Sequence, residues 1–396
     1  MWYPEYESDM ETGKAAVWLA KHSIETRSIP IPDVQEDGLL IRTEASGVCG
    51  TDGHLIEGDP PYPAIMCHEI CGKIVEMGSR ANETLNVYGG PLKVGDRIAL
   101  YPWIMNPRSE GCLKYGPGTC TVTNDSFVYG IPFPKLGLEG DEIISSRVDE
   151  APYFKGGFAE YVYVFPDTYV WKLPDDMPSE VAGLLDPLAV AVRSVELAQT
   201  APGAHEEAFN TSSQVVVVGA GPVGVLTALV CRMMGVEKVI MIGARKTRLR
   251  LSKEVAEVDE IIDIHEMDST DRIQRVKDIT SGGADVVIQC ANVTSAFVEG
   301  LEMIRRLGTL VETGNMVNQG SEVMIDPAKH ICLKHARILG MSANHPGAFD
   351  KAFHILKRHQ KIPFTKLFTH HCGVEGVLDT LGHMRDQDYM KGLMTP

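Results

Sequence analysis

The sequence has little basic charge and no long apolar run. Lys and Arg number 37 against 53 Asp and Glu, so the 396-residue chain has a formal net charge of −16. Because it has no basic surplus to neutralise phosphates, we expect neither nucleic-acid binding nor docking on an anionic membrane. A transmembrane helix needs about 18 consecutive apolar residues, and no run approaches that length. Residues 1–30 also lack a basic segment followed by an apolar one, so we expect a cytoplasmic protein.

Cysteines are few for the length of the chain, and their number is odd. Nine are spread along the sequence, whereas a disulfide framework is typical of short secreted chains with an even count. We therefore expect free thiols or metal ligands. Hydrophobic residues make up 44% and charged residues 23% of the chain, as in ordinary globular proteins. A chain of this length is expected to form two domains.

Two patterns divide the chain. Short alternating apolar stretches with Gly and Pro predict a β-rich first third, with strands at 15–19, 38–42 and 97–100. The segment 85–155 reads as two long loops. Beyond about residue 180, apolar β-branched runs alternate with helical stretches, which predicts a doubly wound parallel sheet. The expected strands are 214–218, 238–242, 261–263, 285–289 and 308–312, and the expected helices are 223–234 and 348–358.

The fold class that follows is α/β, with a doubly wound parallel Rossmann sheet inserted in a β-rich domain. We predict that residues 1–186 and 344–396 form the β-rich part. Residues 187–343 then form a dinucleotide-binding domain.

A glycine-rich turn follows the first of these buried strands. It reads Gly219-Ala-Gly221-Pro222-Val223-Gly224 and opens a helix. The first glycine permits a tight turn, the second lets the backbone approach a pyrophosphate, and the third lets the helix pack on the strand. The N-terminus of the helix offers N–H groups to the phosphates. The turn therefore predicts a dinucleotide site rather than a merely structural turn.

The end of the second strand bears on the choice between NADP and NAD. A carboxylate there would bind the ribose 2′-hydroxyl of NAD, but the position holds Gly243, followed by Ala244 and Arg245. Arg245 can bind a phosphate bidentately, and Lys246 or Arg248 adds positive charge. NADP is therefore favoured over NAD, although a solvated basic start of a helix is an alternative explanation.

Thiol, imidazole and carboxylate side chains gather in two short motifs. One is Gly47-Val48-Cys49-Gly50-Thr51-Asp52, and the other is Cys67-His68-Glu69. Cys and His are zinc ligands, and a catalytic zinc takes three protein ligands and keeps one position open. These motifs resemble the zinc-dependent branch of the medium-chain alcohol dehydrogenase superfamily. The segments 94–98 and 156–161, the dinucleotide turn and Gly314 also follow in the family's order. The resemblance covers nearly the whole chain and implies a GroES-like fold for the β-rich domain.

The resemblance implies roles for individual residues. Cys49, His68 and Asp186 would be zinc ligands, and Glu69 a carboxylate that approaches the metal or orients the site. Asp186 has an alternative role as a helix N-cap before Pro187. Thr51 would hydrogen-bond the substrate oxygen, and His54 would pass the proton to solvent. A turn residue and a surface histidine are the respective alternatives. Gly314 would lie at the cofactor, and Lys391 would contact a cofactor phosphate.

The chain also departs from the family. Cys67 replaces a glycine and is expected to be a small buried thiol. Of the four cysteines that hold a structural zinc in many members, Cys112 and Cys120 are present, while Asn106 and Ser109 occupy the other two positions. We therefore predict one catalytic zinc, no structural zinc, and free thiols at both cysteines, since a disulfide is disfavoured in the cytosol. His330 is expected at the surface.

The function predicted from the sequence is that of a zinc-dependent, NADP-linked alcohol dehydrogenase or carbonyl reductase acting on a small-molecule alcohol, ketone or aldehyde. An NAD-dependent polyol dehydrogenase is the nearest alternative. A zinc-free quinone or enone reductase would lack Cys49 and His68, and a non-catalytic nucleotide-binding protein would not need an open zinc site. We expect a homodimer or homotetramer, paired through the apolar segment 301–311 at a sheet edge.

Overall fold

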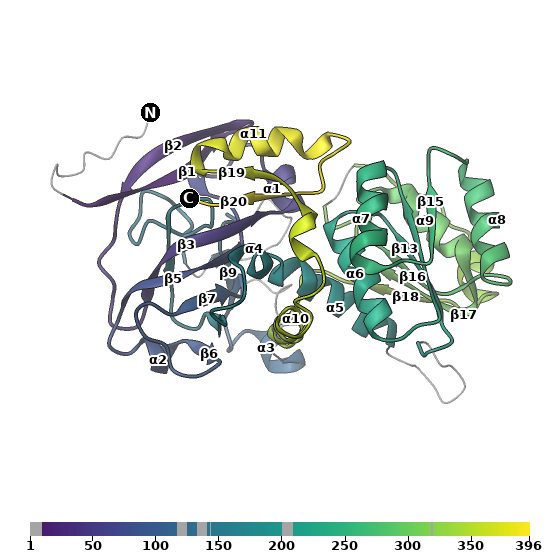
Figure 1. Cartoon of the computed structure of the whole chain (residues 1–396), viewed down its shortest axis with the longest axis horizontal. Helices are drawn as coiled ribbons and strands as arrows, with labels where there is room; N and C mark the ends of the chain where they lie inside the picture. Colours follow the sequence, from purple (N-terminus) through teal and green to yellow (C-terminus); the bar gives the residue numbers. More distant parts are fainter. Residues whose placement is uncertain (1–9, 117–124, 133–140, 143, 200–208, 318–319) are drawn as a thin grey trace.

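The parallel sheet predicted for the second half of the chain is present in the computed structural model (Figure 1). The structure describes residues 10–116, 125–132, 141–142, 144–199, 209–317 and 320–396. Six strands run in the order β15-β14-β13-β16-β17-β18, with every neighbouring pair parallel. The strand order reverses between β13 and β16, and dinucleotides bind at such a point. The strands are β13 (Gln214–Val218), β14 (Lys238–Gly243), β15 (Glu260–Asp263), β16 (Ala284–Gln289), β17 (Ile304–Glu312) and β18 (Arg337–Gly340).

The apolar strands are buried because helices connect them across the sheet. Val215, Val216 and Val217 of β13 have no exposed surface, as the continuous β-branched run predicts. The connecting helices are α6 (Pro222–Met233), α7 (Lys246–Ala256), α8 (Ser269–Ile279) and α9 (Thr294–Met303). The predicted α/β fold class and strand positions are confirmed.

Residues 301–311 do not form the sheet edge through which subunits were expected to pair. Residues 301–303 end α9, and β17 lies inside the sheet between β16 and β18. Apolarity alone does not distinguish an inner strand from an edge strand. Among the described strands, β18 forms that edge of the sheet.

The β-rich part is built around a mixed sheet in the order β19-β20-β3-β5-β7-β12-β6, with β11 also paired to β3. Its C-terminal strands return from the far end of the chain, and β20 pairs antiparallel with β3. The strands are β3 (Leu39–Val48), β5 (Glu69–Met77), β6 (Asn86–Tyr88), β7 (Arg97–Leu100), β11 (Tyr161–Val164), β12 (Tyr169–Lys172), β19 (Phe368–Cys372) and β20 (Lys391–Met394). Two smaller sheets contain β1 (Thr12–Ala20), β2 (Ser23–Pro30) and β4 (Ala64–Ile65), and β8 (Trp103–Met105), β9 (Asp125–Val128) and β10 (Asp141–Glu142).

Helices lie where the two parts meet. In Figure 1, α5 and α10 stand between the β-rich part at the left and the parallel sheet at the right. The remaining helices are α1 (Gly50–Leu55), α2 (Ala81–Thr84), α3 (Glu110–Tyr115), α4 (Ser179–Ala182), α5 (Leu185–Gln199), α10 (Pro346–Arg358) and α11 (Val377–Gly382). The predicted boundary at 186/187 falls inside α5, and the one at 343/344 falls just before α10. Both boundaries stay predictions.

Two further expectations are corrected. The segment 85–155 contains short strands and α3 instead of two long loops. Cys112 is disulfide-bonded and not a free thiol, and the expectation failed because it assumed a cytosolic redox environment that the sequence does not establish. Cys120 lies outside the described residues. Ser109 accepts a hydrogen bond from the Cys112 N–H and caps α3.

In the described part of the chain, no helix combines the length and apolarity needed to cross a membrane.

Candidate active site

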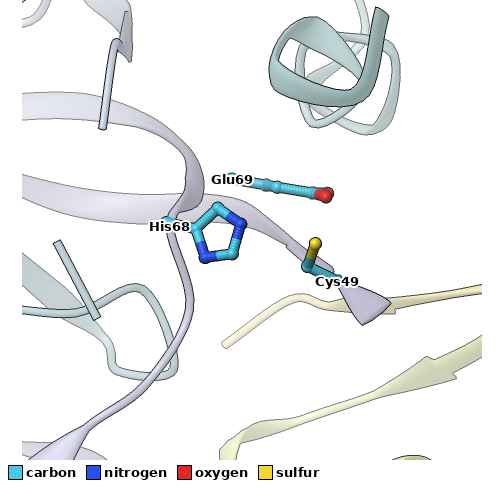
Figure 2. A group of neighbouring side chains, drawn as sticks. All are labelled: Cys49, His68 and Glu69. Carbon is cyan, nitrogen blue, oxygen red and sulfur yellow. The ribbon is translucent and has the colours of Figure 1, made fainter. Parts of the chain in front are cut away.

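Two neighbouring antiparallel strands bring two of the three predicted zinc ligands, Cys49 and His68, together. Cys49 follows β3 directly and begins α1, and His68 immediately precedes β5. The register pairs Gly47 of β3 with Glu69 of β5. Residues just past one strand and just before the other therefore lie side by side, although they are far apart in the sequence. Figure 2 shows the side chains of Cys49, His68 and Glu69 directed toward a common space.

The three side chains form a group that fits a metal ion. One ligand atom from each of Cys49, His68 and Glu69 lies within 4.8 Å of the others. Ligand atoms around a tetrahedral zinc are about 3–4 Å apart, so small movements bring this group onto one ion. The Nδ1 atom of His68 is buried without a hydrogen-bond partner. The metal group itself is defined by the sulfur, imidazole and carboxylate donors, and sulfur and imidazole donors suit zinc.

The electrostatics of the group favour a cation. Burial by itself lowers the pKa of His68, but the Cys49 sulfur, Asp52 and Asp186 outweigh it and raise that pKa to about 10. Asp52 has no exposed surface, and burial raises its pKa. Its Oδ2 accepts a hydrogen bond of 2.9 Å from the Cys49 backbone N–H. Asp52 thereby fixes the backbone at Cys49 and adds negative charge beside the His68 ring.

Lys391 lies beneath the group and not at a cofactor phosphate, which corrects the implication from the family. Its Nζ is 2.5 Å from Oε2 of Glu69, and both side chains are at most 2% exposed. Nζ also donates to the Val48 carbonyl oxygen at 3.1 Å. Burial lowers the pKa of Lys391, but Glu69 and Cys49 outweigh it and raise it to about 12. Lys391 therefore orients Glu69 as a buried cation.

Asp186 approaches the group from a different element. It lies in the first turn of α5 and is 8% exposed. Its Oδ1 accepts a hydrogen bond of 2.9 Å from Nδ2 of Asn344, and the Asn344 carbonyl accepts one of 2.8 Å from the Tyr101 hydroxyl. Asp186 is outside the group within 4.8 Å, although its charge reaches His68 and Glu69. Its role as a ligand stays a prediction.

Thr51 and His54 are three residues apart on α1 and therefore share a face of the helix. The Thr51 Oγ1 is 3.6 Å from the Cys49 Sγ, so the hydroxyl lies beside that sulfur. The Nε2 of His54 is 2.8 Å from Nδ2 of Asn292. Burial lowers the pKa of His54, Glu57 raises it and Arg385 lowers it further. The neutral imidazole is thus favoured.

Cys67 is the buried thiol that the sequence predicted. It has no exposed surface, and its Sγ is 3.4 Å from the Gly47 carbonyl oxygen. Its φ is +82°, a value that a residue with a side chain adopts only with strain. The conformation explains why a glycine is common here, and burial of the thiol offsets part of the cost.

The glycine-rich turn has the shape that a dinucleotide site needs. Gly219 follows β13 with φ +104°, and a Cβ on Gly224 would lie 1.8 Å from the Gly219 carbonyl oxygen. Only glycine permits either arrangement. Gly221 is the N-cap of α6, with Pro222 and Val223 in the first turn, so the first N–H groups of the helix are available to an anion. Gly314 packs against the Ala291 carbonyl, on the loop after β16.

The predicted 2′-phosphate residues lie at the start of α7. Arg245 is the N-cap of α7, and its Nη1 donates to the Met384 carbonyl at 3.0 Å. Nε of Arg248 donates to the Tyr389 carbonyl at 2.8 Å, and its Nη1 is 3.8 Å from the Cβ position of Gly221. Burial lowers the pKa of Arg248 to about 10, where it remains cationic at neutral pH. Each guanidinium keeps further N–H donors for a ligand.

A cavity of about 530 Å³ adjoins this helix start. It is lined by Ala244, Lys246, Thr247, Asp263, His265, Glu266, Gln387 and Asp388. Gly243 packs beside the cavity wall, close to Ala220 of the glycine-rich turn. The cavity lies at the ends of β14 and β15, where the adenosine half of a dinucleotide is held in this topology.

Several residues of the site were not found from the sequence. Asp52 was seen only as part of a motif, although an acid three residues after an N-cap is a recognisable capping signal. Asn292 and Asn344 carry no local signal, because their importance depends on contacts between distant segments.

His330, which lies outside the site, was expected at the surface. It is buried instead, and its Nε2 is 2.9 Å from Oε1 of Glu302.

Comparison with known proteins places the chain among zinc-binding dehydrogenases. The alcohol dehydrogenase GroES-like domain matches residues 35–175, and the zinc-binding dehydrogenase domain matches residues 222–358. D-xylulose reductase A of Aspergillus oryzae is 28% identical over 344 residues, which cover 85% of this chain and 83% of that protein. Sorbitol dehydrogenase of Bacillus subtilis is 27% identical over 308 residues, covering 76% and 74% of the two chains.

Solved structures agree with the fold. An alcohol dehydrogenase from Thermotoga maritima has a TM-score of 0.84 at 25% identity and covers 98% of this chain and 100% of that one. A protein described as a zinc-binding dehydrogenase from Sinorhizobium meliloti, bound to NADP, has a TM-score of 0.78 at 26% identity and covers 98% and 100%.

Proposed function

Because the chain is an oxidoreductase of the zinc-dependent medium-chain alcohol and polyol dehydrogenase superfamily, we propose that Cys49 and His68 hold its catalytic zinc, with Asp186 as third ligand. Glu69 is the neighbouring carboxylate that Lys391 orients. The observation that carries this proposal is the group of sulfur, imidazole and carboxylate atoms that lie within 4.8 Å of one another.

The residues of this chain divide the work of the reaction. When bound, zinc would polarise the substrate oxygen while the nicotinamide exchanges a hydride with the carbinol carbon. Thr51 would hold the hydroxyl of the substrate beside the Cys49 sulfur, because its Oγ1 lies 3.6 Å from that sulfur. His54, one turn further along α1, would take the proton and pass it toward solvent.

NADP is the proposed nicotinamide cofactor. The supporting observation is the pair Arg245 and Arg248 at the start of α7, with no carboxylate at Gly243, the end of β14. The pyrophosphate would lie on the N–H groups at Gly221 and the first turn of α6. NAD use together with turnover of sugar alcohols would favour the polyol alternative, which the relatives D-xylulose reductase and sorbitol dehydrogenase also suggest.

We also propose that the protein is a homodimer or homotetramer. In the described sheet, β18 pairs only with β17, so its outer edge is open to another strand. Large apolar side chains are exposed on the segment that precedes β18 in the sequence, including Met324 at 92% and Leu333 at 68%. Sedimentation of the purified protein would test this assembly, and a monomer would contradict it.

The experiment that tests the proposed function is zinc analysis combined with a turnover screen. Purified protein is assayed for metal content, then with primary alcohols, secondary alcohols, polyols and the corresponding carbonyls, each with NADP and with NAD. One zinc per chain and NADP-linked turnover are expected. Protein that is reconstituted with zinc and turns over none of these substrates with either cofactor would contradict the proposal.

A further inference from the structure

One hydrogen bond joins the two halves of the site at the proton path. His54 lies in the last turn of α1, in the β-rich part, while Asn292 lies three residues beyond β16, in the nucleotide-binding part. Their side chains meet with 2.8 Å between Nε2 and Nδ2, across 238 residues of sequence. The position is significant because the loop after β16 lies at the reversal of strand order, where the nicotinamide end of a dinucleotide passes.

The loop that carries Asn292 is firmly placed. Cys290 donates its N–H to the Val218 carbonyl at 2.7 Å, and Nε2 of Gln289 donates to the Ala291 carbonyl at 2.8 Å. Gly314 packs so closely on the other side that a Cβ there would lie 2.3 Å from the Ala291 oxygen. Asn292 therefore reaches His54 from a rigid support rather than from a loose loop.

An amide suits both protonation states of an imidazole. With a neutral ring, the amide nitrogen of Asn292 donates to Nε2 of His54, and the ring proton is then on Nδ1. With a protonated ring, Nε2 becomes a donor, and the amide oxygen accepts after a half-turn of the amide group. An amide can therefore form a hydrogen bond with either form of the ring.

We propose that Asn292 is a positioning residue for His54 and makes the proton relay depend on contact between the two halves of the enzyme. The proposal rests on the proposed function, in which His54 carries the proton. In the observed arrangement the amide supports the neutral ring, which is the form that accepts a proton during alcohol oxidation. Separation of the halves would release the ring and remove that support.

The other charged groups around His54 lie toward solvent. Glu57 follows α1 and is 41% exposed, and its Oε1 accepts a hydrogen bond of 2.9 Å from Nη2 of Arg385, which is 85% exposed. Glu57 favours the protonated ring and Arg385 the neutral one. His54 therefore lies between Asn292 on the inner side and an ion pair on the solvent side, as a relay requires.

The test is a pH titration of the His54 ring. It is monitored by NMR of the full-length protein labelled with ¹⁵N-histidine. Loss of the amide donor in Asn292→Ala should raise the pKa of His54 by about 0.5–1, the equivalent of one ordinary hydrogen bond to the neutral ring. Asn292→Asp should raise it further, since a carboxylate favours the imidazolium. The acid limb of kcat/KM for alcohol oxidation should move to higher pH in the same order.

A matched control is Asn86→Ala, which removes another side-chain amide, bonded to the Asp167 carbonyl at 2.9 Å, and should leave the titration unchanged. If Asn292→Ala fails to fold, Asn292→Gln displaces the amide by one methylene and serves the same comparison. An unchanged His54 pKa in the Ala (or Gln) and Asp variants would overturn the inference. Failure of the proposed function would appear separately, as a zinc-loaded wild type without turnover, while the ring titration would still be measurable.

Discussion

The two halves of the active site are built from different materials. On the zinc side, function depends on buried charged or polar side chains, such as Glu69 and Lys391, each at most 2% exposed in the side chain. On the nucleotide side, it depends on backbone N–H groups at a glycine-rich turn, supplemented by partly exposed arginines. Buried charges depend on one another, so the loss of one is severe. A backbone site has no side chain to lose, and single arginines there adjust specificity.

The largest expected effect is at the zinc side. Cys49→Ser should remove zinc and lower turnover by about 10³-fold or more, because several kcal/mol of transition-state stabilisation depend on the metal. NADP binding should persist, since it depends on the other half. Metal analysis and cofactor titration by fluorescence check both statements, with Cys332→Ser, at an exposed thiol, as the matched control. Retention of zinc by the Cys49 variant would remove that residue from the site.

The second prediction concerns the buried ion pair. Lys391→Met leaves Glu69 charged and buried without its partner, which should lower the free energy of unfolding by about 3–5 kcal/mol. The double variant Glu69→Gln with Lys391→Met should recover part of that loss. Urea unfolding in the presence of a chelator measures the difference without a contribution from zinc. Equal stability of the wild type and Lys391→Met would show that the pair contributes nothing.

The nucleotide side is expected to respond by a change of specificity. Arg245→Ala should weaken NADP binding by about 10–100-fold, which corresponds to one charge-assisted contact, and should change NAD binding little. Dissociation constants for both cofactors test this. Equal weakening of both would defeat the assignment of Arg245 to the 2′-phosphate.

The smallest expected effect comes from a partly exposed cluster in the nucleotide-binding part, formed by Glu302, Lys329 and His330. Burial alone would raise the pKa of Glu302, but hydrogen bonds from Lys329 and His330 outweigh it and hold that pKa at about 2, below the ordinary 4.5. Because the pKa of Glu302 is lower in the folded state than in the unfolded state, its carboxylate stabilises the fold above pH 4.5. This contribution to the free energy of unfolding is lost as the pH falls toward 2.

Glu302→Gln should therefore cost about 1 kcal/mol at pH 7 and less as the pH approaches 2. Unfolding free energies of both proteins across this range provide the check. A deficit that grows with falling pH would contradict the assignment.

The same contrast explains what the sequence could predict. Buried parallel strands such as Gln214–Val218 and the glycine-rich turn were predictable because their signals are local: period, residue type and spacing. Cys49 and His68 were predictable because short motifs surround them. Lys391, Asn292 and Asn344 act through partners far along the chain, and no local pattern reports such contacts. His330 was misplaced for the same reason, since only the fold places Glu302 beside it.

The most direct measurement is anomalous X-ray diffraction from crystals of the zinc-loaded protein, collected on both sides of the zinc absorption edge. The account predicts one strong peak per chain, bonded to the sulfur of Cys49 and the imidazole of His68 and completed by the carboxylate of Asp186. A peak at another place in the chain, or none between those two residues, would contradict it.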